Sequence, residues 1–406
     1  MKKSAVPPAI TRRNVLAAAV PLGVAMGAGL PSGARAAVPA RAAADPLPPG
    51  ENTIDLRTDG TYSTVPLRKE VIAISVVQMR VRQVDAANPK PGLKANLAHM
   101  IELIDEAQHG GLFLKNDLLF FHEFALTGYS DRWDRKDALK IAIELPGEET
   151  EALSAKAREH DCYIVFGSYA RDRDWPGHVL SIATTIAPSG KIINKSWKAR
   201  DLRGVWAGGK FEVFTSTIFD NLSRFVEMYG WDAVVPVVRT DIGNFTTTST
   251  QGDPELPRAA AMKGCEIFLR TATGGFTPID AQADAYYNGI YSCVANNAIS
   301  PDNPGFFPSA GGWGISQGYG GSVAYGPRGE LLGKADADNQ EQEVVVPIPI
   351  GQFRRFHRQP MAYMDLYRPV FDRYVGPYPP DILAKTLPPD GEAMARYVAS
   401  KWRWAR

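Results

Sequence analysis

Short apolar runs alternate with amphipathic segments along most of the chain. The runs at 71–79 and 163–169 have the length of buried strands, whereas apolar residues recur at helical spacing at 93–104. Turn-forming residues at 188–190 and 326–329 join neighbouring runs as hairpins. This alternation, with hairpins interspersed, predicts mixed β-sheets covered by helices in one domain rather than two.

The stretch 244–255 is rich in hydroxyl groups and separates an apolar run from a helical pattern. The apolar run at 233–238 predicts a strand, and the helical pattern covers 256–264. Many α/β hydrolases hold their nucleophile at such a strand-to-helix turn. Successive hydroxyl-bearing residues occupy this one, with no cysteine among them: Thr247, Thr248, Ser249 and Thr250. Their hydroxyls either take part in catalysis or satisfy backbone groups at a strand end, and both interpretations stay open.

The N-terminal segment has the features of an export signal. Arg12 and Arg13 precede a weakly apolar run at 17–30, and small residues around Ala36 form a cleavage site. Paired arginines before such a run resemble a twin-arginine signal. Glycines and a proline make the run poor at spanning a bilayer, which favours cleavage over an anchor helix. We therefore expect export to the periplasm or the extracellular space, with no membrane contact in the mature form.

The domain boundaries follow from changes in composition. Residues 1–45 are interpreted as the export signal and the start of a linker, and residues 46–70, rich in proline and charge, as an N-terminal arm. The alternating pattern at 71–350 predicts the folded domain. The proline- and tyrosine-rich tail at 351–406 is expected to pack on its own body or on a neighbour.

Composition excludes several classes of partner and cofactor. The chain is 45% hydrophobic and 22% charged, with a net charge of +1, so nucleic acid is not an expected partner. Cys162, Cys265 and Cys293 lack metal-like spacing and are expected to be buried apolar residues. Without a glycine-rich phosphate loop or a His/Cys cluster, the sequence implies neither an organic cofactor nor a metal.

Four segments, in the same order, resemble motifs of the nitrilase superfamily of carbon–nitrogen hydrolases. They are Asp-Leu-Leu-Phe-Phe-His-Glu-Phe-Ala-Leu-Thr-Gly-Tyr at 117–129, Lys-Ser-Trp-Lys at 195–198, Pro-Glu-Leu-Pro-Arg-Ala-Ala-Ala-Met-Lys-Gly-Cys-Glu-Ile-Phe-Leu-Arg at 254–270, and Tyr-Gly-Gly-Ser at 319–322 with the hairpin after it. The resemblance implies an α/β fold, a four-layer α-β-β-α sandwich with mixed sheets. It also implies hydrolysis of a non-peptide C–N bond in a small amide, N-carbamoyl compound or nitrile.

The same resemblance implies roles for individual residues. Glu123 corresponds to the general base, and Lys198 corresponds to the cation that stabilises the oxyanion. The family's catalytic cysteine is absent from its expected position. Counting back from Pro254-Glu255 puts Thr248 there, whereas counting forward from the preceding strand puts the position near Thr250.

Tyr129, Ser249 and Glu212 are the residues expected to bind substrate. Ser249 lacks the β-branch of Thr248 and therefore fits a strained bend better. Glu212 is the counterpart considered for a further acid of the family. The Gly/Pro/aromatic loop at 299–319 is long enough to be a pocket wall or lid.

Two hypotheses of different classes follow from the missing thiol. In the first, the protein is an amidase-like hydrolase in which a hydroxyl, or water directly, replaces the thiol. In the second, it is a catalytically inactive nitrilase-fold protein retained for ligand binding or assembly. A hydroxyl needs a stronger and better placed base than a thiol, so the geometry around Glu123 is decisive. Because the family commonly pairs its subunits, a homodimer or larger homo-oligomer is expected.

Overall fold

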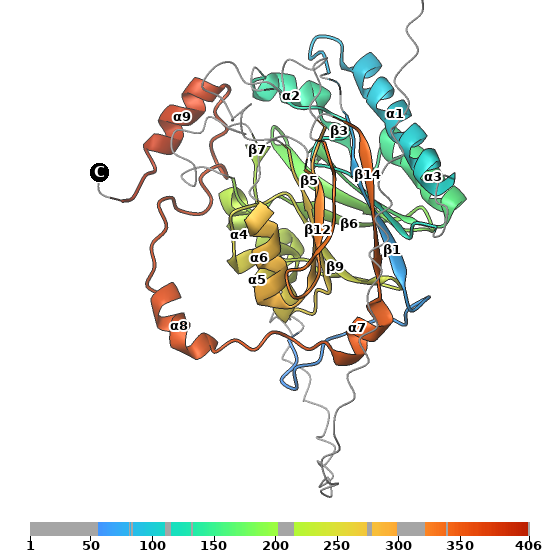
Figure 1. Cartoon of the computed structure of the whole chain (residues 1–406). Coiled ribbons are helices and arrows are strands. Elements are labelled where there is room, and N and C mark those ends of the chain that lie inside the picture. Colours follow the sequence, from blue (N-terminus) through green and yellow to red (C-terminus); the bar gives the residue numbers. More distant parts are fainter. Residues whose placement is uncertain are drawn as a thin grey trace, which may run out of the picture.

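Two β-sheets pack face to face in the computed structural model of the chain, and helices cover their outer faces (Figure 1). The structure describes residues 56–80, 82, 84–109, 115–130, 133–201, 215–273, 278–298, 321–337 and 340–404. The predicted export signal, the start of the arm, Glu212 and the loop at 299–319 lie outside the described residues.

The first sheet has eight strands and contains a parallel centre. Strands β1, β2 and β4 run parallel, and the order across the sheet is β14-β1-β2-β4-β5-β6, with β3 beside β4 and β7 beside β5. Antiparallel pairing joins β14 to β1, β5 to β4 and β6 to β5. The strands are β1 (Ile72–Gln78), β2 (Leu118–Phe120), β3 (Ile143–Glu144), β4 (Tyr163–Arg171), β5 (Val179–Ile186), β6 (Ile192–Trp197), β7 (Thr215–Ser216) and β14 (Gln342–Ile348).

The second sheet has six strands in the order β13-β12-β11-β10-β9-β8. Its centre, β9, β10 and β11, is again parallel, and antiparallel strands flank it. The strands are β8 (Val238–Thr240), β9 (Gly243–Thr248), β10 (Ile267–Thr271), β11 (Tyr291–Ala295), β12 (Val323–Tyr325) and β13 (Leu331–Lys334).

Helices on opposite sides complete four layers. The outer face of the first sheet is covered by α1 (Pro89–His109), α2 (Arg135–Ile141) and α3 (Glu148–His160), and that of the second by α5 (Glu255–Met262) and α6 (Pro278–Asn288). A further helix, α4 (Leu222–Tyr229), packs against β5 and β6. The predicted α-β-β-α sandwich is therefore confirmed. None of the helices in the described ranges has the length and apolar character needed to cross a membrane.

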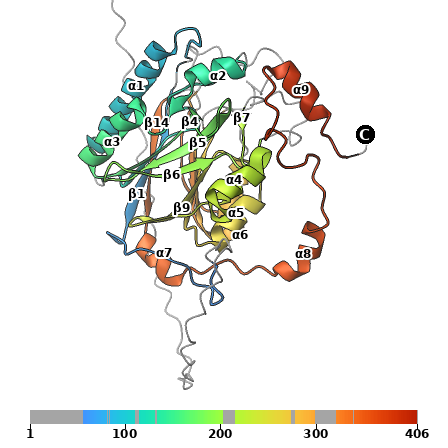
Figure 2. The same ribbon diagram turned by 180° about the vertical axis from the view of Figure 1, so that it is seen from behind.

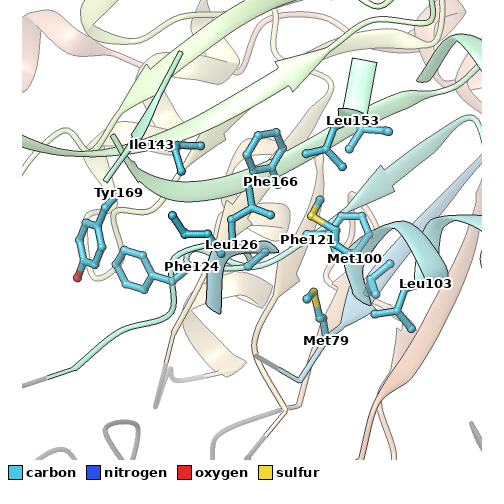
Figure 3. Close-up of a cluster of buried hydrophobic side chains, with 14 of the residues drawn as sticks. Met79, Met100, Leu103, Phe121, Phe124, Leu126, Ile143, Leu153, Phe166 and Tyr169 are labelled. Carbon is cyan, nitrogen blue, oxygen red and sulfur yellow. The ribbon is translucent and has the colours of Figure 1, made fainter. Parts of the chain in front are cut away.

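Alternation along β2 explains why its residues are apolar on both faces. Leu118 and Phe120 face the second sheet, in a cluster that includes Phe245 of β9. Phe121, just after the strand, faces the helices together with Phe166 of β4 (Figure 3). Each such side chain contributes about 1.5–3 kcal/mol when fully buried. The strand is thus fixed from both sides, and so is the position of the residues that follow it.

The first half of the hydroxyl-rich stretch is a strand, which corrects the prediction of a turn. Here β9 covers Gly243–Thr248, and part of the preceding apolar run, predicted as a strand, belongs to a 3-10 turn at Trp231–Val234. Threonine is β-branched and favours strands. Its hydroxyls also find partners: Thr246 donates to a backbone carbonyl at 3.0 Å, and Thr247 accepts from Asn194 at 3.3 Å. Satisfied polar side chains therefore fill a buried strand.

The N-terminal arm and the start of the C-terminal tail meet at Glu266, whose side chain is fully buried. Its carboxylate accepts from the Tyr62 hydroxyl at 2.9 Å, from the Asn244 N–H at 2.7 Å, and from the Arg354 guanidinium at 2.7 and 2.8 Å. Burial and the adjacent carboxylate raise the pKa of Tyr62 far above its ordinary value. Arg354 lies on α7 (Ile350–Phe356), so the start of the tail is tied to the strand that leads into the hydroxyl-rich stretch.

The tail then leaves the body and returns to it. Helix α8 (Met364–Phe371) stands apart from the sandwich in both views (Figures 1 and 2). The chain returns at Asp381, which accepts a backbone N–H of α4 at 2.8 Å, and ends in α9 (Gly391–Ala399). No residue of α8 is buried, and the side chains of Leu366 and Val370 are 69% and 66% exposed.

Candidate active site

Glu123 and Lys198 form a buried ion pair. Glu123 lies shortly after β2, Lys198 directly follows β6, and their exposed fractions are 4% and 3%. The Lys198 Nζ donates to Glu123 Oε1 at 3.1 Å. Two charges removed from water in this way stabilise each other only while both are present. The structure therefore brings together the two residues to which the resemblance assigned the base and the oxyanion-stabilising cation.

Gly167 of β4 leaves the space that the Glu123 backbone occupies. A Cβ at Gly167 would lie 2.5 Å from Glu123 Cα, far inside ordinary contact distance. The Gly167 N–H donates to the His122 carbonyl at 3.0 Å, and the Glu123 N–H donates to the Ala272 carbonyl, which follows β10, at 3.4 Å. Glu123 is thus held between the two sheets by its backbone.

Ser181 of β5 joins both members of the pair, and sequence reasoning missed it. Its Oγ donates to Glu123 Oε1 at 3.2 Å, and its carbonyl accepts from the Lys198 N–H at 2.9 Å. In the sequence, Ser181 is one of three hydroxyl-bearing residues in a strand that is buried throughout. Such residues are common in buried strands, so this signal alone indicates no role.

The alternation along β9 indicates which hydroxyl approaches Ser181, the hydrogen-bond partner of Glu123. Side chains at odd positions face the first sheet: Phe245 joins the apolar cluster between the sheets, and Thr247 bonds Asn194 of β6. The next odd residue is Ser249, whose Oγ lies 3.4 Å from Ser181 Oγ. The sequence count put Thr248 in this position, but the structure connects the following residue to Glu123.

Thr248 and Thr250 bond backbone groups instead. The Thr248 Oγ1 accepts from the Thr250 N–H at 3.0 Å, and the Thr250 Oγ1 accepts from the Ala199 N–H at 3.0 Å. These two hydroxyls therefore fit the interpretation of local backbone partners that the sequence left open. Ser249, which lies between them, does not.

The turn after β9 is held on two sides. Arg200 donates to Asp253 at 3.0 Å and to the Gly252 carbonyl at 2.6 Å. The Gly252 N–H donates to Asp280 at 3.0 Å, and Asp280 also pairs with Arg270. The position of Ser249 is thus fixed by both flanks of the turn.

Tyr129 and Glu212 were the other two residues expected to contact substrate. Tyr129 is half-buried and stacks on Phe124 with ring centroids 5.8 Å apart, packed against the buried cluster to which Phe124 belongs. Its role as a substrate contact stays a prediction. Glu212 lies outside the described residues, and its role stays a prediction as well.

Burial lowers the reactivity of the other candidate nucleophiles and bases, three cysteines and His122. Burial raises the pKa of Cys162 to about 11 and the pKa values of Cys265 and Cys293 to about 12, so all three thiols are protonated near neutral pH. Burial also lowers the pKa of His122 to about 3. Its Nδ1 accepts from the Phe124 N–H at 3.3 Å, which places the proton of the neutral ring on Nε2.

One acidic cluster on the outer helices has the composition of a metal site. Asp105, Glu159 and His160 offer ligand atoms within 4.8 Å of one another. The ammonium of Lys156 already lies among them, 2.8 Å from Asp105 and 3.0 Å from Glu159. A cation of the protein's own thus balances these carboxylates, and the cluster is an ion-pair network.

The two-sheet sandwich with its buried Glu–Lys pair agrees with comparison to known families. The family model described as carbon-nitrogen hydrolase matches residues 73–358. The chain belongs to this family, within the nitrilase superfamily.

Individual relatives are distant. The chain is 24% identical over 234 residues to the formamidase of Helicobacter acinonychis (strain Sheeba), and the match covers 53% of this chain and 60% of that protein's length. Among solved structures it resembles the amidase from Nesterenkonia sp. AN1. A variant in complex with butyramide gives a TM-score of 0.50 at 18% identity, over 73% of this chain and 96% of the other. A variant with an acetamide moiety added at its active-site cysteine gives 0.51 at 18% identity, over 76% and 99%. These likenesses show the fold.

Proposed function

We propose that this protein hydrolyses the C–N bond of a small amide, with Ser249 as nucleophile, Glu123 as general base and Lys198 as donor to the oxyanion. The observation that carries the proposal is the buried Glu123–Lys198 pair with a serine hydroxyl connected to it through Ser181. The similar proteins are a formamidase and an amidase complexed with butyramide, which favours an amide over a nitrile or an N-carbamoyl compound.

The geometry suits acyl transfer to a hydroxyl. Glu123, which pairs with Lys198, accepts the proton that the nucleophile loses as its oxygen attacks the amide carbon. An ammonium has three N–H donors, so Lys198 can hold Glu123 and an oxyanion together. One such donor typically contributes about 3 kcal/mol to the transition state. The proton then passes to the leaving nitrogen, and water hydrolyses the resulting ester by the same route.

The inactive alternative has its own support. Family members such as the Nesterenkonia amidase have an active-site cysteine, whereas the three cysteines of this chain are buried and carry raised pKa values. A hydroxyl is the weaker nucleophile at neutral pH. In this alternative the same group of residues would bind an amide without turnover.

Measuring the ammonia that purified mature protein releases from candidate substrates separates the hydrolase hypothesis from the inactive alternative. Formamide, acetamide, butyramide, small nitriles and N-carbamoyl compounds would be tested with the wild type and with Glu123→Gln, which keeps shape and removes charge. Turnover of amides that Glu123→Gln abolishes supports the hydrolase. The inactive alternative would be supported if the wild type turned over none of these compounds faster than Glu123→Gln does.

A matched pair of variants assigns the nucleophile. Ser249→Ala and Thr248→Val each remove one hydroxyl with little change of shape. We expect Ser249→Ala to abolish turnover and Thr248→Val to retain most of it. The reverse result would return the nucleophile to Thr248, and turnover that survives both changes would favour direct attack by water.

We also propose that the mature protein is exported and assembles as a homodimer or larger homo-oligomer. Export is supported by the pattern around Arg12 and Arg13, which lies outside the described residues. Assembly is supported by the exposed apolar side chains of α8. Replacing both arginines by lysine keeps the charge and should leave the precursor in the cytoplasm; normal export of that variant would refute a twin-arginine signal.

A further inference from the structure

Ser181 lies between the base and the nucleophile assigned above. Its Oγ is 3.2 Å from Glu123 Oε1 and 3.4 Å from Ser249 Oγ, and Ser181 and Ser249 are 1% and 5% exposed. We propose that Ser181 carries the proton between Ser249 and Glu123 during catalysis. This inference rests on the proposed hydrolase function and adds a residue that no motif assigns.

The direction of the hydrogen bonds follows from the chemistry of the three groups. An ionised carboxylate only accepts, so the Ser181 hydroxyl donates its proton to Glu123. The lone pairs of Ser181 Oγ are then left to accept from Ser249, whose Oγ has Ser181 as its hydrogen-bond partner within the described ranges. The chain of donors therefore runs from Ser249 to Ser181 to Glu123. A distance of 3.4 Å is long, but catalytic hydrogen bonds often shorten when substrate binds.

The backbone of Ser181 fixes where its hydroxyl points. On one side β5 pairs with β4, with Ser181 opposite Tyr169, and on the other the Ser181 carbonyl accepts the Lys198 N–H at 2.9 Å. Both contacts involve the main chain alone. Removing the hydroxyl therefore leaves the strand and the Lys198 backbone in place, which makes the relay separable from a structural role.

The proton balance of the step is complete. As the Ser249 Oγ–carbon bond forms, the Ser249 proton moves to Ser181 Oγ and the Ser181 proton moves to Glu123. When the C–N bond breaks, the proton on Glu123 returns through Ser181 to the leaving nitrogen, which departs as ammonia or an amine. Water repeats the sequence on the ester and releases the acid. No oxidant, reductant or further reactant is needed.

The test compares Ser181→Ala with a matched control. Ser168→Ala on the neighbouring strand also removes a buried serine hydroxyl, one without a hydrogen-bond partner in the described structure. We expect Ser181→Ala to lower kcat about 100- to 10,000-fold, the usual range for acid–base catalysis, with little change in KM. Ser181→Thr, which keeps a hydroxyl, should recover most of the loss, and Ser168→Ala should match the wild type.

Repeating the Ser181→Ala test in a variant with a cysteine nucleophile distinguishes a proton relay from a structural role of Ser181. In Ser249→Cys the nucleophile is partly ionised without help, so Ser181→Ala should cost at least tenfold less there than in the wild type. The rate of alkylation by iodoacetamide at position 249 gives the same comparison without an amide substrate. An equal cost in both backgrounds, or wild-type kcat in Ser181→Ala, would overturn the relay while leaving the hydrolase intact. Absence of wild-type turnover on every substrate would instead overturn the proposed function and the relay with it.

Discussion

Replacing Gly167 by alanine tests whether Glu123 is held where β4 leaves room for it. The added Cβ would lie 2.5 Å from Glu123 Cα, whereas carbon atoms in contact are about 3.5–4.0 Å apart. The segment that carries Glu123 must therefore move by roughly 1 Å. Misplacement of this size can lower a catalytic rate about 100-fold, and overpacking a buried site costs about 1–3 kcal/mol of unfolding free energy.

Two measurements check this prediction. The kcat/KM for the best amide substrate should fall about 100-fold, and the urea midpoint should fall with it. Gly376→Ala is the control, since its Cβ would approach no atom closer than 3.7 Å. The stability measurement applies whether or not the protein turns over an amide. A Gly167→Ala variant with the wild-type midpoint and rate would refute the placement of Glu123 against β4.

Three further predictions concern stability and assembly. Burial lowers the pKa of His122 to about 3 in the folded protein, whereas the same imidazole in the unfolded chain has the ordinary pKa of about 6.5. Between these two pH values the unfolded chain binds more protons than the folded one, so the free energy of unfolding should fall by about 2–3 kcal/mol from pH 6.5 to pH 4. In urea titrations, His122→Phe should flatten that slope, and an unchanged slope would contradict the assignment. Arg354→Met leaves Glu266 buried without its cation and should lower the free energy of unfolding by about 3–5 kcal/mol. Adding Glu266→Gln should regain part of that loss. A loss below about 1 kcal/mol would contradict the buried pairing. Leu366→Asp with Val370→Asp should shift the proposed oligomer to monomers in light scattering, and an unchanged mass would exclude α8 from the contact.

The layered fold and the positions of Glu123 and Lys198 could be predicted because their signals are local. Glu123 ends a largely apolar run that contains β2, and Lys198 directly follows β6 within the motif Lys-Ser-Trp-Lys. Strands buried on both faces are apolar throughout, so their existence shows in the pattern even where their pairing does not.

The contact between Ser249 and Ser181 could not be predicted because it depends on alternation through a strand whose extent the pattern missed. A one-residue difference in a strand moves a side chain to the opposite face, and Thr248 and Ser249 differ by that one residue. Ser181 is a second case, since it lies 58 positions from Glu123 and 68 from Ser249 along the chain. These three residues meet because β2, β4 and β5 are neighbours in one sheet and β9 of the other sheet packs against β5.

The junction at Glu266 has a consequence for the order in which the protein matures. Strand β9 begins beside this carboxylate, yet the guanidinium that pairs with it is carried by Arg354, 88 positions further along the chain. A nascent or truncated chain that ends before α7 therefore has an uncompensated charge beneath the strand that positions Ser249. We expect such chains to stay open to proteases and to lack a formed site, so that the site is completed only after α7 has been synthesised.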